Sequence, residues 1–182
     1  MSDKTTIDIV RWDQLTGRAD LLPAIDGIFF EASATKTFAS DEARLAFRER
    51  WLGRYLTHFP QHAYLALSPA RAVRGYVVGS VEDPARLELF RDIPHFGSFR
   101  ALTSQYPAQL HINIASDWRS QGLGARLVET FCQGARVAGA PGVHVVTARG
   151  MRNVRFYEAI GFTEAGQTSI DGRELLFLAR TL

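Results

Sequence analysis

The feature that most constrains this chain is a strand that leads through a glycine-containing turn into a long amphipathic helix. Residues 109–115 alternate between two kinds of side chain, with Leu110, Ile112 and Ile114 on one face of the predicted strand. The turn and a helix over 122–138 follow at once. The predicted apolar stripe of this helix consists of Gly124, Leu127, Val128, Phe131, Ala135 and Ala138.

The rest of the chain also alternates between strand and helix patterns. Apolar periodicity, caps and turn residues predict helices over 21–32, 42–56 and 153–160. They predict further strands over 5–12, 62–67, 74–81, 143–147, 162–168 and 175–182. This order indicates a single mixed α/β domain, spanning 1–182, with about seven strands.

Residues 83–107 form the longest connection. They contain Pro84, Pro94 and Pro107, and the pattern allows a short helix over 85–90. A connection of this length in a compact domain is typical of a lid, a binding loop or a mobile segment. We therefore expect an insertion or lid here.

Composition excludes several classes of protein. The formal net charge of +2 is too small to indicate nucleic-acid or membrane binding. Cys132, the only cysteine, allows neither an internal disulfide nor a cysteine-based zinc site, and we expect it to be a small core residue. There is no signal-peptide pattern and no apolar run of the roughly 20 residues that cross a bilayer. We expect a cytoplasmic protein without a metal.

The turn between strand and helix has the physics of an anion site. The first N–H groups of a helix lack internal partners, and the helix dipole is positive there. Gly122 and Gly124 would let phosphate oxygens approach the backbone. Six arginines against one acid over 119–155 suit a ligand with several phosphates. A dinucleotide fingerprint lacks its third glycine and a Walker loop its lysine, whereas a turn chosen only for packing stays possible.

In this context the sequence resembles the GNAT superfamily of N-acetyltransferases. Arg119-x-x-Gly122-x-Gly124 is similar to the acetyl-CoA signature of that family. The strand residues 111–114 and the segment 156–162 (Phe-Tyr-Glu-Ala-Ile-Gly-Phe) resemble two further hallmarks, in the right order and spacing. The resemblance implies a mixed, mostly antiparallel twisted sheet flanked by helices and splayed beside strand four.

The resemblance also implies a set of residues that bind acetyl-CoA. The strand backbone would bind the pantetheine arm, and N–H groups at the helix start would hold the pyrophosphate. These positions are Ile112, Asn113, Ile114, Arg119, Gln121, Gly122, Leu123, Gly124, Ala125 and Arg126, and we expect Asn153 and Tyr157 to contact the cofactor as well. The family asparagine falls on Gly150, and Asn153 lies nearby but out of register, so whether Asn153 replaces it is open.

Acetyl transfer to an amine needs a proton donor for the leaving thiolate and a base for the amine. Tyr157 matches the family tyrosine that acts as the general acid. His111 is a candidate base because its unperturbed pKa is near 6.5. Glu31 and His95 are further candidates for the base or for substrate contacts, and a water-mediated base is equally compatible.

These residues predict an acyltransferase that moves an acetyl group from acetyl-CoA to a small-molecule primary amine. Two alternatives stay open: a catalytically silent coenzyme A-binding sensor or interaction domain, and a protein or peptide N-acetyltransferase. A homodimer is possible. The sequence does not identify the acceptor.

Overall fold

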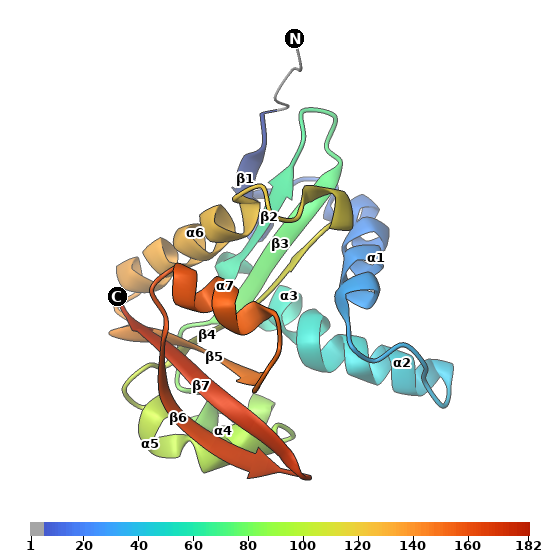
Figure 1. The fold of residues 1–182 in the computed structure, drawn as a ribbon. Coiled ribbons are helices and arrows are strands. Elements are labelled where there is room, and N and C mark those ends of the chain that lie inside the picture. Colours follow the sequence, from blue (N-terminus) through green and yellow to red (C-terminus); the bar gives the residue numbers. More distant parts are fainter. Residues whose placement is uncertain (1–5) are drawn as a thin grey trace. The chain divides into compact units, whose positions relative to one another are not determined.

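The structure is a computed structural model that describes residues 6–182. The described residues form two compact units, residues 6–79 with 111–131 and residues 80–110 with 132–182. Seven strands form one sheet in the order β1-β2-β3-β4-β5-β7-β6 (Figure 1). The predicted seven-stranded mixed sheet is therefore confirmed. The strands are β1 (Asp8–Arg11), β2 (Ala63–Leu67), β3 (Val73–Ser80), β4 (Ala108–Ile114), β5 (Gly142–Ala148), β6 (Thr163–Ile170) and β7 (Arg173–Thr181).

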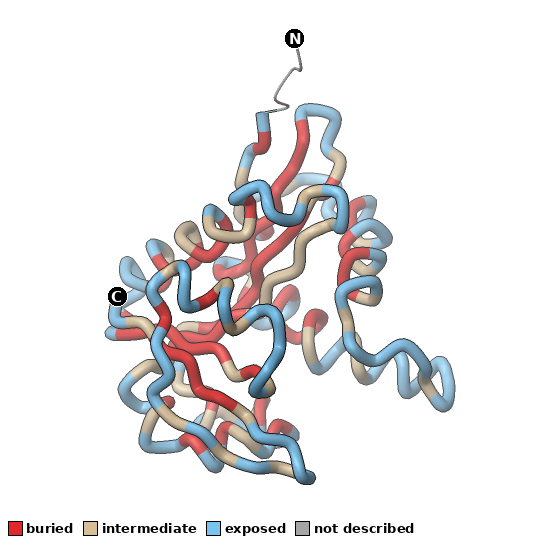
Figure 2. The backbone as a smooth tube through the Cα atoms, in the orientation of Figure 1, coloured by how far each residue is buried: buried red, intermediate tan, exposed pale blue. Residues whose placement is uncertain are grey.

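In the first unit, β1, β2 and β3 form an antiparallel meander. Every residue of β2 is buried, and β3 is buried along nearly its whole length (Figure 2). The sequence predicted a first strand from residue 5, which lies outside the described residues. The remaining predicted bounds of these strands agree with the structure to within a few residues.

Helix α1 (Leu22–Ala32) follows the predicted helix closely. The predicted helix over 42–56 is continuous but not uniform. It begins as α2 (Asp41–Arg48), widens into a π-helical turn (Glu49–Gly53) and ends as α3 (Arg54–His58). Ser40 caps its start, because the Ser40 hydroxyl accepts a hydrogen bond of 3.2 Å from the Ala43 N–H. No residue of α2 is buried, and Figure 2 shows this helix mostly exposed.

Helix α6 (Leu123–Val137) presents the predicted apolar stripe to the core, with one correction. Ala138 lies beyond the helix and is exposed, so the stripe ends about one turn early. Cys132 is fully buried, as expected of a small core residue. The buried members of the helix are Leu123, Leu127, Val128, Phe131, Cys132 and Ala135.

In the second unit, β5 and β6 each pair antiparallel with β7. Strand β4 pairs parallel with β5 at only two positions, Ala108 with Val143 and Gln109 with His144. The ladder ends there, which agrees with the predicted splay beside strand four. Helix α7 (Asn153–Ala159) lies between β5 and β6 in the sequence.

Residues 83–107 fold into short helices instead of one long loop. Where the pattern allows a short helix over 85–90, the structure has two 3₁₀ turns, Pro84–Arg86 and Glu88–Phe90, with extended backbone at Leu87. Helices α4 (Pro94–Ser98) and α5 (Arg100–Thr103) follow. Phe90, Phe96 and Phe99 are all buried. The segment is anchored by its aromatic residues, and its role as a lid stays a prediction.

Among the described residues, no helix is both long and apolar enough to cross a bilayer.

Gly75 on β3 gives the first testable prediction. A Cβ at this position would lie 2.7 Å from Ile114 Cδ1 and 3.0 Å from the Asn113 carbonyl oxygen. We expect Gly75→Ala to lower the free energy of unfolding by about 1–3 kcal/mol, because the backbone of β4 must shift. Denaturant titration measures this. Gly27→Ala on α1 is the control, since its Cβ meets nothing within 4 Å. Equal stability of the two variants would contradict the prediction.

Candidate active site

Strand β4 carries two polar side chains that are hydrogen-bonded within the first unit. Tyr55 Oη lies 3.1 Å from Nε2 of His111. Asn113 Nδ2 donates a hydrogen bond of 2.8 Å to Tyr76 Oη. Burial raises the pKa of Tyr76, which keeps its hydroxyl neutral, and the hydrogen bond with Asn113 opposes this shift. The alternation of the strand therefore places His111 and Asn113 among ordered hydroxyl groups.

The helical segment around the π turn surrounds His111 with aromatic rings. The ring of Trp51 lies 5.4 Å from that of His111, in edge-to-face geometry, and the ring of Tyr55 lies 5.2 Å away. π-helical turns are frequent at functional sites. The sequence did not indicate Tyr55, because Tyr55 and His111 are far apart in the chain and meet only in the folded structure. The proposed role of His111 as a base stays a prediction.

The turn after β4 has the backbone geometry that an anion site needs. A 3₁₀ turn (Ser116–Trp118) is followed by two residues in the left-handed region, Ser120 with φ 61° and Gly122 with φ 79°. Helix α6 then begins at Leu123. The Arg126 N–H donates the first helical hydrogen bond, 3.2 Å, to the Gly122 carbonyl. By helix geometry, the N–H groups just before Arg126 have no partner inside the helix.

This geometry narrows the set of backbone N–H groups that could bind a pyrophosphate. The Arg126 N–H is used by the helix, so the N–H groups available to a pyrophosphate are those of Gly122 to Ala125. The Gln121 side chain stabilises the turn itself, since Nε2 donates a hydrogen bond of 2.8 Å to the Asp117 carbonyl.

Three of the arginines counted in the sequence are hydrogen-bonded within their own unit. Arg119 Nε donates to the Ile114 carbonyl at 3.0 Å. Arg126 donates to the Ile7 carbonyl at 2.8 Å. In the second unit, Arg149 contacts Glu164 at 2.9 Å, Glu174 at 2.7 Å and Gln167 at 2.7 Å. These guanidinium groups stabilise the fold, so the anion site depends on backbone N–H groups more than the arginine count suggested.

Tyr157 lies on α7 in the second unit. Its side chain is 5 % exposed, and its ring packs edge-on against Phe156 at 5.1 Å and Phe162 at 5.4 Å. Burial raises the pKa of Tyr157, so the phenol stays protonated at neutral pH. Nearby on the same helix, the Asn153 Oδ1 accepts a hydrogen bond of 2.9 Å from the Thr147 hydroxyl. Asn153 therefore holds the start of α7 against β5.

The two remaining candidates differ in environment. Glu31, at the exposed end of α1, has its carboxylate 3.4 Å from Arg119, so it lies beside the predicted anion site. His95 lies on α4 in the second unit, half-buried, with its ring 4.5 Å from Phe96. Burial lowers the pKa of His95 to about 4. His95 is neutral at pH 7 but is a weak base.

Comparisons with known proteins agree with this arrangement. A family model for the acetyltransferase (GNAT) domain matches residues 85–164, a range that includes β4, the Gly122 turn, α6 and Tyr157. No curated protein matches. Among solved structures, SsHAT is 19% identical with a TM-score of 0.70, covering 97% of this chain and 98% of that one. A GCN5-related N-acetyltransferase from Kribbella flavida is 16% identical with a TM-score of 0.66 and full coverage of both chains.

A third structure is the NatC complex bound to Gag peptide and CoA. It is 15% identical with a TM-score of 0.64, and the match covers 97% of this chain and 98% of that one. These structures share the fold. The family match indicates that residues 85–164 resemble the acetyltransferase (GNAT) domain.

The low pKa of His95 predicts a pH-dependent stability. Because the folded-state pKa, about 4, lies below the ordinary value of 6.5, protonation favours the unfolded chain. This contribution is fully present above pH 6.5 and is lost as the pH falls towards 4. We expect wild type to lose on the order of 1–2 kcal/mol more than His95→Gln between pH 7.5 and 4.5. Denaturant titrations at several pH values measure the difference.

His58→Gln is the control, because His58 is exposed. That variant should keep the wild-type pH dependence. An unchanged pH dependence in His95→Gln would show that His95 is not buried as described.

Proposed function

We propose that the protein transfers the acetyl group of acetyl-CoA to the primary amine of a small molecule. The observation that carries this proposal is the turn between β4 and α6. There the left-handed Gly122 and the helix start leave backbone N–H groups available to a pyrophosphate. Bound acetyl-CoA would supply a thioester that an amine can attack.

Backbone groups of β4 and of the start of α6 would bind acetyl-CoA. The N–H groups of Gly122 to Ala125 would hold the pyrophosphate, and the backbone of Ile112 and Ile114 the pantetheine arm. As the amine attacks, negative charge develops on the carbonyl oxygen of the thioester. A backbone N–H of strand β4 that has no other partner would stabilise this charge. Leu123 and Ala125 take part through their backbones alone.

Two side chains are the candidates for proton transfer. Tyr157 remains protonated because it is buried, and it would donate its proton to the leaving thiolate. His111 would accept the proton of the amine, with its ring oriented by Tyr55. Alternatively, a water molecule would accept the proton of the amine in place of His111. Asn153 and His95 have no assigned step.

We also propose that the acceptor of the acetyl group is a small molecule and not a peptide. It rests on the expectation that residues 83–107 act as a lid, which would disfavour a long peptide. The main competitor is a peptide acceptor, because the NatC structure holds a peptide. A screen of small amines, polyamines and peptides for acetyl-CoA-dependent thiol release separates the two. Binding of acetyl-CoA without release on any of them would favour a sensor.

Gly122→Ala tests the anion site. Its φ of 79° makes an alanine strained by roughly 1–2 kcal/mol, and the added Cβ would occupy open space beside the N–H groups proposed to hold the pyrophosphate. We expect the Kd for coenzyme A, measured by calorimetry, to rise about tenfold or more. Gly139→Ala is a matched control, since Gly139 has φ 87° and equal free space but lies beyond the other end of α6. An equal change in Kd in both variants would contradict the assignment.

Tyr157→Phe tests the proton donor. Phenylalanine keeps the ring contacts with Phe156 and Phe162 and removes only the hydroxyl. We expect kcat to fall by about 10²-fold while the Kd for coenzyme A stays within twofold. A kcat equal to that of wild type at saturating amine would remove Tyr157 from the mechanism.

A further inference from the structure

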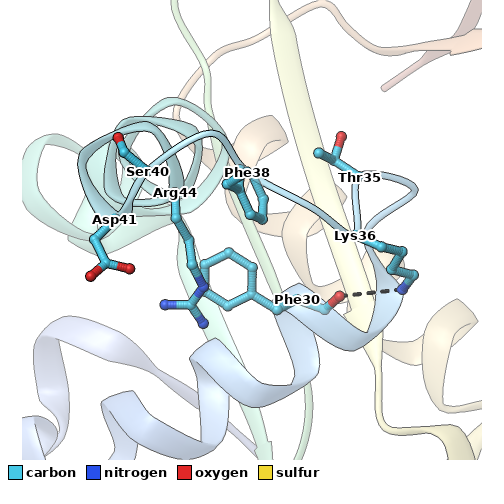
Figure 3. Close-up of a pocket in the computed structure, with 7 residues that line it drawn as sticks. All are labelled: Phe30, Thr35, Lys36, Phe38, Ser40, Asp41 and Arg44. Carbon is cyan, nitrogen blue, oxygen red and sulfur yellow. Dashed lines mark hydrogen bonds between the residues drawn. The ribbon is translucent and has the colours of Figure 1, made fainter.

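A groove lies in the first unit between the end of α1 and the start of α2 (Figure 3). Its volume is about 610 Å³. Its lining combines two phenyl rings, two cations, one carboxylate and two hydroxyls. The residues are Phe30, Thr35, Lys36, Phe38, Ser40, Asp41 and Arg44.

The charge most available to a ligand in this groove is Arg44. Its guanidinium carbon lies 3.7 Å from the centroid of the Phe30 ring, so the planar group lies against that ring (Figure 3). Among the described residues, this stacking is the one interaction found for the Arg44 side chain. Stacking holds a guanidinium in place and leaves its N–H edge open, which suits the two oxygens of a carboxylate.

Of the other polar groups of the groove, Lys36 and Ser40 stabilise helix ends and Asp41 has the opposite charge. The Lys36 ammonium donates to the carbonyls of Glu31 at 2.7 Å and Phe30 at 3.4 Å, where it caps the end of α1. The Ser40 hydroxyl caps α2. Asp41 adds a negative charge, which makes the groove mixed in charge. A zwitterion suits this groove better than a polyanion.

The apolar part of the groove consists of aromatic rings that pack against one another. The rings of Phe30 and Phe38 meet edge to face at 6.0 Å, and Phe38 and Phe47 are 5.3 Å apart. Phe30 and Phe38 are only half-buried, so they offer apolar surface to a ligand.

Side-chain contacts link this groove to the predicted anion site within the same unit. Glu31, whose carbonyl Lys36 caps, has its carboxylate 3.4 Å from Arg119. Arg119 in turn donates to the carbonyl of Ile114, the last residue of β4. The end of α1 is thus joined to the end of the strand and to the start of the turn.

We propose that the groove holds the acetyl acceptor, and that the acceptor is an amine that also carries a carboxylate, as an amino acid does. Arg44 binds the carboxylate, and the rings of Phe30 and Phe38 bind an apolar side chain. Arg44 is therefore a specificity residue of the acceptor site. This inference rests on the proposed acetyl transfer and names its substrate class.

The test uses acceptor pairs that differ in one group. Phenylalanine, tyrosine and leucine are each compared with their amides, which keep the amine and side chain but lack the carboxylate. Thiol release from acetyl-CoA gives kcat/KM for wild type, Arg44→Ala and Arg44→Lys. We expect Arg44→Ala to lower kcat/KM at least tenfold for the acids, mainly through KM, and less than twofold for the amides. Arg44→Lys should be intermediate, and the KM for acetyl-CoA should not change.

Arg18→Ala is the control, because Arg18 is an exposed arginine whose guanidinium lies over an aromatic ring, that of Trp12, at 5.5 Å. It should leave all values unchanged. An equal loss for acids and amides in Arg44→Ala would overturn the inference, as would acetylation by wild type only of amines that lack a carboxylate.

A direct binding measurement separates this inference from the proposed function. If no amine gives thiol release, acetyl transfer fails, and phenylalanine is titrated into the wild type and Arg44→Ala by NMR. Saturable binding that is lost in Arg44→Ala would support a carboxylate-binding groove without transfer. Absence of binding to the wild type would overturn the groove as well.

Discussion

The left-handed backbone at Ser120 and Gly122 is the constraint on which the candidate site depends. It turns the chain at the end of β4 so that α6 begins at Leu123. A glycine accepts this φ without steric cost, whereas Ser120 adopts it at some cost. The helix start then leaves its N–H groups unpaired within the helix, at the end of a strand whose alternate faces carry isoleucine and polar side chains.

Side chains around the turn mostly stabilise this backbone. Arg119 bonds to the end of β4, Arg126 bonds to the carbonyl of Ile7, and Gln121 bonds to the carbonyl of Asp117. A fixed backbone is an advantage for anion binding, because N–H groups that are already oriented lose little entropy when a ligand binds. These three side chains therefore stabilise the turn, and a bound anion would contact the backbone of Gly122 and the helix start.

The sequence predicted the strands and long helices because their signals are local. The alternation around His111 and the apolar stripe around Leu127 need only their own residues to be recognised. The features that the sequence did not predict depend on contacts between residues that are distant in the chain. The helices of 83–107 are too short to be stable alone and form where Phe96 and Phe99 are buried. The contact between Tyr55 and His111 joins residues that are far apart in the chain. The stacking of Arg44 on Phe30 joins two helices and leaves no trace in the sequence.

The central claim is that backbone N–H groups at the start of α6 bind coenzyme A. Amide NMR of the ¹⁵N-labelled protein during a coenzyme A titration tests it most directly. The account predicts that the amides of Gly122, Leu123, Gly124 and Ala125 show the largest shifts and that all follow one saturation curve. Saturable binding with unchanged amides at these four residues, and shifts elsewhere, would contradict it.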